Sequence, residues 1–412
     1  MSSVEVWLWL LLVMQPYNPK TIKIIEKCGG DATAAATLIR DGECGFLSER
    51  ERRQAKQIRS RDVHKLLDIC AENDIRIITL DDEEYPLRLK AIPNPPIVLF
   101  AKGSLEGLDD EMAIAVVGTR NGCEYSANVC RTICGELAKI GTTIVSGLAV
   151  GLDSVAHRAC VNAGGRTVGV LACGTLVNYP AENAQLKRDI LASGGALISE
   201  LLPNSTTYAS YFQHRNRIIS GLASGTLIVE ASARSGCLLT AEHTIEQGRD
   251  LFCIPPHDIN SPRFAGVMPL LRDGAIPVFG YMDIVNEYIY GYLHSESWRS
   301  ILEGINSGMR MRDEEEAPKK KKPAVKAADN PAMSGEPKGS LDESVFESLD
   351  PTVSAVLRLI AEKPLNIDEV IVRSGMSHMD VAAALTDLEM FGYISRNMEG
   401  TYEIADSREA EE

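Results

Sequence analysis

The chain has 412 residues, of which 45% are hydrophobic and 24% are charged, and no apolar stretch reaches membrane-spanning length. This composition is typical of a globular protein long enough for two or three cores, and it excludes an integral membrane protein built of helices. The formal net charge is −15, but residues 112–280 hold 13 Lys and Arg against 12 Asp and Glu, so a local anion site remains open in this central segment.

The first 80 residues predict a small helical domain. Apolar residues recur at helical spacing, and glycines at positions 29, 30 and 42 interrupt the pattern. The apolar run Trp7–Met14 has no basic residue before it and no small-residue cleavage site after it, so we expect a buried helix and not a signal peptide. Residues 81–111, with prolines at 93, 95 and 96, predict an extended connector.

Residues 112–290 predict an α/β domain with a doubly wound parallel sheet, because short apolar runs alternate with helical patterns such as Ala127–Ile140 and Leu239–Gln247. The expected strands are Ala113–Gly118, Thr142–Ser146, Thr167–Leu171, Ala196–Ser199, Thr226–Glu230, Leu251–Ile254 and Ala275–Phe279. Such sheets bind ligands at the carboxyl ends of their strands, so the residues that follow each strand are the candidates for a site.

The first two of these strand ends combine glycines with hydrogen-bonding groups. In the segment Gly118–Arg120, glycine allows close approach of a ligand, and arginine offers a forked donor to phosphate. In the segment Ser146–Asp153, glycines let backbone N–H groups face an anion at the start of a helix, with Asp153 as its N-cap. Ordinary packing turns fit both patterns as well, and neither is a dinucleotide or nucleoside-triphosphate fingerprint.

Basic residues accompany the later strand ends. Lys187 and Arg188 follow the segment Asn178–Asn183, whose tyrosine suits either a stacked base or the core. Arg215 and Arg217 are two residues apart and therefore point to different faces of their helix. We expect one of them to serve a ligand and the other to serve an internal carboxylate such as that of Glu230.

The last strand end of interest holds Arg234, Ser235 and Gly236 before a helix, where N–H groups again suit an anion and a small-residue packing turn is equally consistent. No Ser-His-Asp order and no G-x-S-x-G motif is present, so we expect no catalytic residues. Glycine, serine, asparagine and arginine at successive strand ends suit a site that binds a phosphate backbone without breaking it.

Ten cysteines and seven histidines are spread along the chain without a Cys-x-x-Cys pair or metal-ligand spacing. We interpret the cysteines as reduced thiols of a cytoplasmic protein, since most lie in apolar segments. We expect no metal, no cofactor and no membrane partner.

The C-terminal part predicts a linker and a third domain. Residues 305–345, rich in Glu, Lys, Pro and Ala, predict a disordered linker that contains Lys319–Lys322. Residues 350–405 predict three helices and a hairpin, which is the order of a winged-helix domain. The expected elements are Val353–Ile360, Ile367–Ser374, a helix from Ser377 with the apolar face Val381, Ala384, Leu385 and Leu388, and the hairpin strands Tyr393–Arg396 and Thr401–Ile404.

Six motifs, taken in order, resemble the DNA processing protein A family, also called Smf, of bacterial transformation proteins. They are Gly-Thr-Arg at 118–120, Ser-Gly-x-Ala-x-Gly-x-Asp at 146–153, Tyr-Pro-x-x-Asn at 179–183, Ser-Glu at 199–200, Arg-Asn-Arg-Ile-Ile-Ser-Gly-Leu at 215–222 and Ser-Gly-x-Leu-x-Thr-Ala at 235–241. The helical front, the connector and the winged-helix tail are similar too, so the resemblance covers nearly the whole chain.

The resemblance implies an extended Rossmann fold behind a front domain similar to a sterile alpha motif or helix-hairpin-helix. It implies a homodimer without catalytic activity that binds single-stranded DNA, protects incoming DNA, loads the RecA recombinase and displaces single-strand-binding protein in natural transformation and recombination. By resemblance, the DNA-binding pocket holds Arg120, Ser146, Gly147, Asn183, Arg215, Asn216, Ser235 and Gly236. Position adds Lys187 and Arg188, and the neighbours Gly118, Thr119, Arg217 and Arg234 complete the candidate set.

Two other functions stay open. A nucleotide phosphoribohydrolase would carry Pro-Gly-Gly-x-Gly-Thr, but the chain has Pro255-Pro256-His257 and no such string anywhere. A winged-helix transcription regulator would place its third helix in the major groove, but this helix bears Asp380, Asp387 and Glu389 and no Lys or Arg. We therefore assign the winged helix to protein contacts.

Overall fold

The computed structural model describes residues 2–292, 351–374 and part of 376–404. They fall into two compact units, one within residues 1–318 and one within 319–412, and each is described by itself. The predicted linker 305–345 lies outside the described residues. No described helix is long and apolar enough to cross a membrane.

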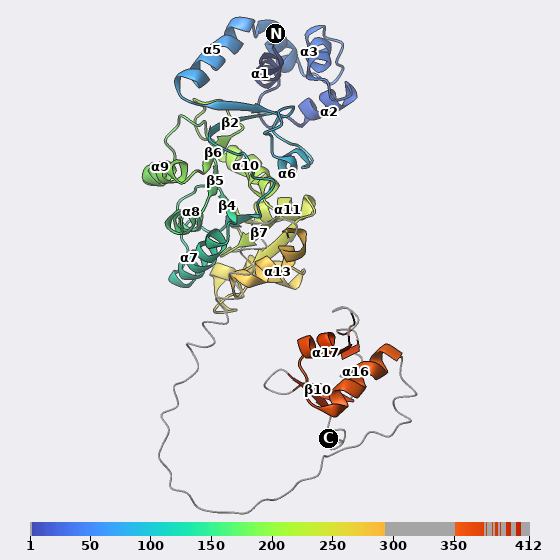
Figure 1. Cartoon of the computed structure of the whole chain (residues 1–412). Coiled ribbons are helices and arrows are strands. Elements are labelled where there is room, and N and C mark those ends of the chain that lie inside the picture. The colour runs from blue at the N-terminus through green and yellow to red at the C-terminus, as the bar shows by residue number, and fades with distance from the viewer. Residues whose placement is uncertain are drawn as a thin grey trace, which may run out of the picture. The chain divides into compact units, whose positions relative to one another are not determined.

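A nine-stranded sheet runs through the first unit in the order β1-β2-β6-β5-β4-β3-β7-β8-β9 (Figure 1). Its strands are β1 (Arg76–Thr79), β2 (Val98–Gly103), β3 (Ala113–Val117), β4 (Thr143–Ser146), β5 (Thr167–Val170), β6 (Ala196–Ser199), β7 (Gly225–Ile228), β8 (Asp250–Cys253) and β9 (Ile276–Pro277). Strands β3 to β9 pair in parallel and lie close to their predicted positions. This part confirms the predicted doubly wound α/β sheet.

Helices cover both faces of this sheet (Figure 1). One face carries α7 (Glu124–Lys139), α8 (Leu152–Asn162), α9 (Ala184–Ala192) and α13 (Tyr281–Tyr292), and the other carries α6 (Leu87–Lys90), α10 (Ala209–Leu222), α11 (Leu238–Glu246) and α12 (Val267–Arg272). Alternate residues of a strand enter opposite cores: Ala115 of β3 faces α10 and α11, whereas Val116 faces α7 and α8. Burial on both faces explains why these strands are continuous apolar runs.

The predicted connector 81–111 is wrong as a separate segment, because it contains a strand of the sheet. β2 pairs antiparallel with β1 on one side and with β6 on the other, so the sheet is also not purely parallel. Its side chains alternate between two cores: Leu99 packs in the core beneath α6 and α10, and Phe100 packs among the N-terminal helices. A strand buried on both faces joins the two regions and does not space them apart.

The N-terminal helices pack on this antiparallel edge of the sheet. They are α1 (Ser3–Met14), α2 (Pro19–Lys27), α3 (Ala32–Arg40), α4 (Glu49–Gln57) and α5 (Ser60–Glu72). Trp7–Met14 is almost entirely buried within α1, as the sequence predicts. The predicted boundary at residue 80 is not a boundary, because β1 belongs to the sheet.

The second unit contains α16 (Pro351–Glu362), α17 (Ile367–Ser374) and an antiparallel hairpin of β10 (Ile394–Arg396) and β11 (Tyr402–Ile404). The predicted apolar face of the third helix is buried in the core of this unit; its members are Val381, Ala384, Leu385 and Leu388. The acidic residues that the sequence places on that helix lie outside the described residues.

Candidate functional site

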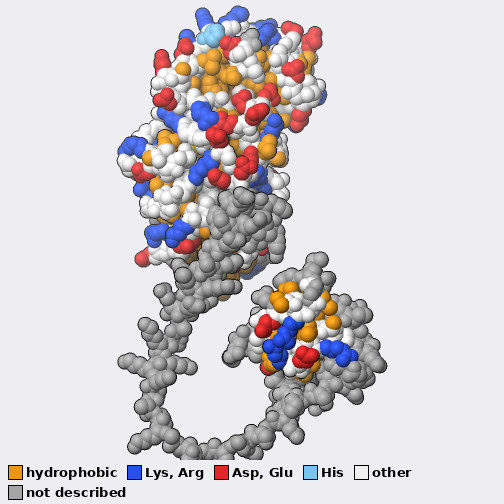
Figure 2. All heavy atoms as spheres, viewed as in Figure 1, with side chains coloured by type: hydrophobic (Ala, Val, Ile, Leu, Met, Phe, Trp, Pro, Cys, Tyr) orange, Lys and Arg blue, Asp and Glu red, His pale blue; other side chains and the backbone are white. Residues whose placement is uncertain are grey.

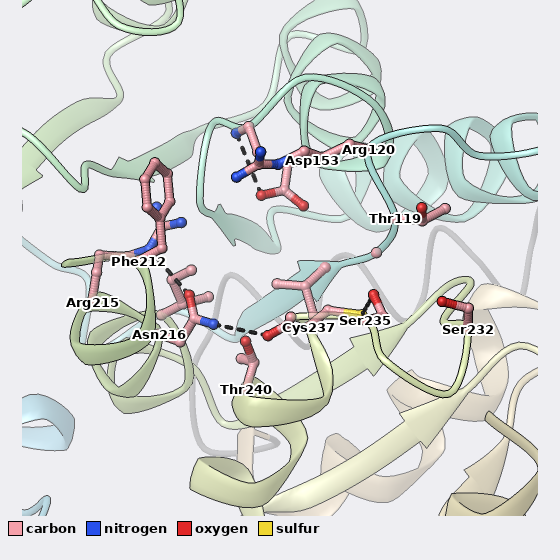
Figure 3. Close-up of a pocket in the computed structure, with 15 residues that line it drawn as sticks. Thr119, Arg120, Asp153, Phe212, Arg215, Asn216, Ser232, Ser235, Cys237 and Thr240 are labelled. Carbon is pink, nitrogen blue, oxygen red and sulfur yellow. Dashed lines mark hydrogen bonds between the residues drawn. The ribbon is translucent and has the colours of Figure 1, made fainter. Parts of the chain in front are cut away.

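The order of the strands creates a crevice at one point of the sheet. From β3 the chain winds through β4 and β5 to β6, crosses by α10, and continues on the other side of β3 with β7, β8 and β9. The loops after β3 and β7 therefore leave in opposite directions, and ligands of α/β sheets bind at such a switch point. A cavity of about 330 Å³ lies there, and we name it the switch-point pocket (Figure 3). It is lined by Val117, Gly118, Thr119, Arg120, Ala149, Asp153, Phe212, Arg215, Asn216, Ile219, Ser232, Ser235, Gly236, Cys237 and Thr240.

Half of the fourteen residues that the sequence proposes line this pocket. They are Gly118, Thr119, Arg120, Arg215, Asn216, Ser235 and Gly236. Gly147 lines a smaller adjoining hollow. Three separate stretches of the chain thus meet here: the loops after β3 and β7, as the strand-end argument predicts, and helix α10.

Arg120 and Phe212 form the mouth of the pocket. Both line the pocket and two adjoining hollows, and the Arg120 guanidinium carbon lies 5.3 Å from the centre of the Phe212 ring (Figure 3). Tyr179 stands edge-on to Phe212, with 5.9 Å between the ring centres, and is 37% exposed. The sequence suits Tyr179 either to a stacked base or to a place in the core, and its position at the surface excludes the place in the core.

Arg215 places a buried positive charge at the floor of the pocket. Its Nη1 donates to the carbonyl oxygen of Gly147 at 2.7 Å and to that of Val170, and its Nε donates to Asn216 Oδ1 at 3.3 Å. These bonds join α10 to the loop after β4 and to the end of β5. Since backbone carbonyls hold the guanidinium, its position is fixed before any ligand arrives.

Asp153 is the buried counter-charge of Arg215. Burial raises the pKa of Asp153, while Arg215 and the backbone N–H groups of Ala149, Gly118 and Gly147 act in the opposite direction. The Ala149 N–H lies 3.5 Å from Oδ2 of the carboxylate. The sequence placed this residue at the N-cap of α8, but Gly151 is the N-cap and Asp153 lies in the first turn. Its carboxylate holds the loops after β3 and β4 together.

Side chains of neighbouring helices leave no room for a Cβ at two glycines of this site. A Cβ on Gly118 would lie 2.6 Å from Leu152 Cδ1, and one on Gly147 would lie 2.5 Å from Arg215 Nη2. Packing against Leu152 is thus one reason for glycine at position 118, and the approach of a ligand to Gly118, which lines the pocket, stays a prediction. Gly236 differs, since a Cβ there would meet nothing within 4 Å, although the residue lines the pocket.

Ser146 and Asn183 support the pocket from behind. Ser146 Oγ donates to the carbonyl oxygen of Val116 at 2.6 Å. Asn183 Nδ2 donates to the carbonyl oxygen of Leu148 and to Ser154 Oγ, both at 2.9 Å. Both side chains are buried and do not line the cavity, so they position its loops.

Three further basic candidates lie outside the pocket. Lys187 Nζ donates to the carbonyl oxygen of Tyr179 at 2.9 Å, and burial lowers its pKa. Arg188 is exposed and donates to Gln185 Oε1. Arg234 is exposed on the loop after β7 and does not line the cavity.

Arg217 serves an internal carboxylate, but not the predicted one. Its Nη1 lies 2.8 Å from Glu200 Oε2, on the face of α10 that looks away from the pocket. Glu230 instead pairs with Arg263 at 3.2 Å and accepts a hydrogen bond from the Cys123 N–H at 2.9 Å. The sequence showed that the two arginines diverge, but it contained no information on which strand end α10 would meet.

Sequence reasoning missed several lining residues, chief among them Phe212, Ser232, Cys237 and Thr240. Helical spacing was the available signal for Phe212, because it precedes Arg215 and Asn216 by three and four residues and so shares their face. The same spacing relates Thr240 to Cys237. Ser232 had no signal beyond its place after a strand.

The comparisons with known proteins agree with this architecture. The family described as "DNA recombination-mediator protein A" matches residues 76–289, and the one described as "DprA winged helix domain" matches residues 343–400. "DNA processing protein DprA" of Bacillus subtilis is 40% identical over 223 residues, which cover 54% of this chain and 74% of that relative. "Protein Smf" of Escherichia coli is 34% identical over 291 residues, which cover 71% of this chain and 76% of that relative. The X-ray structure of DNA processing protein A from Streptococcus pneumoniae matches with a TM-score of 0.60 and 29% identity, covering 70% of this chain and 99% of that one.

Proposed function

Because the chain belongs to the DNA recombination-mediator protein A family, we propose that it binds single-stranded DNA at the switch-point pocket. The observation that carries this proposal is the pair at the mouth of the pocket, where the exposed guanidinium of Arg120 lies over the ring of Phe212. A single strand offers phosphates to the cation and unpaired bases to the ring.

The groups around the pocket suit a sugar–phosphate backbone. In the part of the chain that the structure describes, the N–H groups of Arg120 and Gly236 donate to no protein acceptor. Ser232 and Ser235 add hydroxyl groups on the opposite wall (Figure 3). Backbone N–H groups and hydroxyls contact phosphates without reading bases, so we expect little sequence preference.

We further propose that the site binds without catalysing a reaction. Asp153 is the only carboxylate among the lining residues, and backbone N–H groups already engage it. Binding would serve recombination: a cytoplasmic homodimer would protect incoming strands, load a RecA-type recombinase and displace single-strand-binding protein in natural transformation. These partners rest on the resemblance to the family.

Filter binding with a labelled oligothymidylate tests the site. We expect Arg120→Ala to weaken binding about tenfold, equivalent to about 1.4 kcal/mol. The slope of log affinity against log salt concentration should fall by about one, because one phosphate contact is lost. Arg131→Ala is the control, because Arg131 is exposed on α7 and its side chain donates to Asn128 Oδ1 in the same helix. Equal affinity of Arg120→Ala and the unaltered protein would reject the pocket as the binding site.

A second assay separates binding from hydrolysis. The protein is incubated with nucleoside monophosphates, and free base is sought by chromatography. We expect none. Release of base that disappears in Asp153→Asn would replace this proposal with the phosphoribohydrolase.

A further inference from the structure

Helix α4 and the first half of α5 carry a concentration of positive charge that the pocket does not use. Residues 49–65 hold seven Lys and Arg and three Asp and Glu, in a chain whose net charge is −15. All seven basic side chains are exposed: Arg50, Arg52, Arg53, Lys56, Arg59, Arg61 and Lys65. We name them the basic surface. Figure 2 shows blue side chains, interspersed with red ones, along the edge that the N-terminal helices form.

The neighbouring carboxylates are largely engaged within the protein. Glu51 is buried and accepts hydrogen bonds from Asn18 Nδ2 at 2.8 Å and from Lys20 Nζ at 3.1 Å. Asp62 accepts from the Arg59 N–H at 2.9 Å and lies 3.7 Å from Arg61. Of the three acids, Glu49 alone is exposed.

This arrangement is unfavourable for the protein by itself. Arg52 and Lys56 are four residues apart on α4, and Arg53 and Lys56 are three apart, spacings at which like charges repel each other on a helix. Arg59 stands at the N-cap of α5, where the helix dipole disfavours a cation. A bound polyanion would remove both penalties.

An exposed aromatic ring adjoins the basic surface in the chain. Phe46, two residues before the N-cap Ser48 of α4, is 54% exposed, and Lys27 Nζ lies 3.9 Å from its ring centre. Exposed rings among cations are the combination on which single-stranded nucleic acids bind, since bases stack while phosphates meet charge. The exposed residues of α4 are charged or polar, so the helix lacks the apolar face that a lipid surface requires.

We infer that the basic surface binds the phosphates of single-stranded DNA beyond the nucleotides held in the switch-point pocket, an inference that rests on the proposed function. A cavity of about 330 Å³ encloses only a ligand of small-molecule size. The remainder of a strand must therefore lie on the outer surface of the protein. The basic surface provides a second contact for it, so affinity should depend on the length of the strand.

The test compares two lengths of oligothymidylate, about ten and about forty nucleotides, on the full chain. The variant combines Arg50→Glu, Arg53→Glu and Lys56→Glu. The matched control combines Arg131→Glu, Lys139→Glu and Arg158→Glu, which change the net charge equally at exposed positions of α7 and α8. We expect the variant to bind the long strand at least about tenfold more weakly, with a salt slope smaller by about two. The short strand should bind unchanged, and the control should behave as the unaltered protein does.

The other outcomes show whether the proposed function or only this inference fails. If the unaltered protein binds neither oligonucleotide, the proposed function and this inference both fail. If it binds both and the variant matches it, or the variant and the control lose affinity alike, only the inference fails. If the variant binds anionic vesicles more weakly than the unaltered protein does but binds the long strand equally well, the basic surface is assigned to lipid and the inference fails.

A footprint in the unaltered protein needs no substitution. Acetylation of Lys56 and Lys65 should slow when the long oligothymidylate is bound, whereas Lys139 on α7 should react as before. Equal reactivity of Lys56 and Lys65 with and without the oligonucleotide would contradict the inference.

Discussion

The switch-point pocket and the N-terminal helices each bury a charged side chain, but they satisfy its hydrogen bonds in different ways. Arg215 bonds to carbonyl groups 68 and 45 residues away in the sequence. Glu51 accepts from the Ser48 N–H, three residues away, within a capping box, and also from Asn18 and Lys20, 33 and 31 residues away. The bonds of Arg215 to carbonyl groups exist only after the sheet has formed, whereas one turn of helix already supplies part of those of Glu51. The charge at the site therefore depends more on distant segments than the charge in the N-terminal helices does.

The largest expected effect comes from removing the buried charge of Arg215. Arg215→Met leaves carbonyl groups and the Asp153 carboxylate without their partner, and we expect a loss of about 3 to 5 kcal/mol in the free energy of unfolding. Urea denaturation measures it. A loss below about 1 kcal/mol would show that the Arg215 guanidinium is not needed to hold the loops after β4 and β5 in place.

The pH dependence of this variant sharpens the comparison. Without Arg215, the pKa of Asp153 should rise further above its ordinary value. A group with a raised carboxyl pKa destabilises the folded state increasingly as pH rises above the pKa of the unfolded chain. Arg215→Met should therefore lose more stability at pH 8 than at pH 5, and adding Asp153→Asn should remove that difference.

The next effect concerns the buried charge of Glu51. Burial raises the pKa of Glu51, but hydrogen bonds from Ser48, Asn18 and Lys20 outweigh it and lower the pKa to about 2. Glu51→Gln should cost about 2 to 3 kcal/mol at pH 7. Because a lowered carboxyl pKa stabilises the fold above the ordinary value, this cost should vanish as pH falls from about 4.5 toward 2. Urea titrations at pH 7 and pH 3 measure it, with Glu49→Gln as the exposed control; a cost independent of pH would contradict the argument.

A smaller effect tests the contact between a loop and the pocket floor. In Gly147→Ala the new methyl group would meet the Arg215 guanidinium, which carbonyl groups hold in place. We expect a loss of about 1 to 3 kcal/mol, as for other overpacked sites. Thermal denaturation measures it. An unchanged melting temperature would mean that Arg215 can move aside.

The smallest effect on stability is expected at Gly236. Alanine there meets open space, so stability should stay within about 0.5 kcal/mol. Because Gly236 lines the pocket, the added methyl group should hinder a bound strand and lower the affinity for an oligothymidylate. Gly280→Ala, also in open space but not a lining residue, should change neither property. Normal DNA binding by Gly236→Ala would place the strand elsewhere.

The sequence by itself determined the elements whose pattern is local. Strands β3 to β8 were predictable because each is buried on both faces and so reads as a continuous apolar run. The apolar face of the last helix was predictable because residues three and four apart share a face, and Val381, Ala384, Leu385 and Leu388 are buried as expected. The polar residues at strand ends followed from the general rule for α/β sheets, so half of the proposed residues line the pocket.

The tertiary structure alone decided which distant segments meet. Strand pairing, which a single strand's pattern does not encode, brought β2 into the sheet between β1 and β6. The crossing of α10 directed Arg217 to Glu200 and turned Phe212 toward Arg120. The contact with the Arg215 side chain of α10 requires glycine at position 147. Each outcome depends on how elements far apart in the chain pack against one another, and the periodicity within one element does not specify that packing.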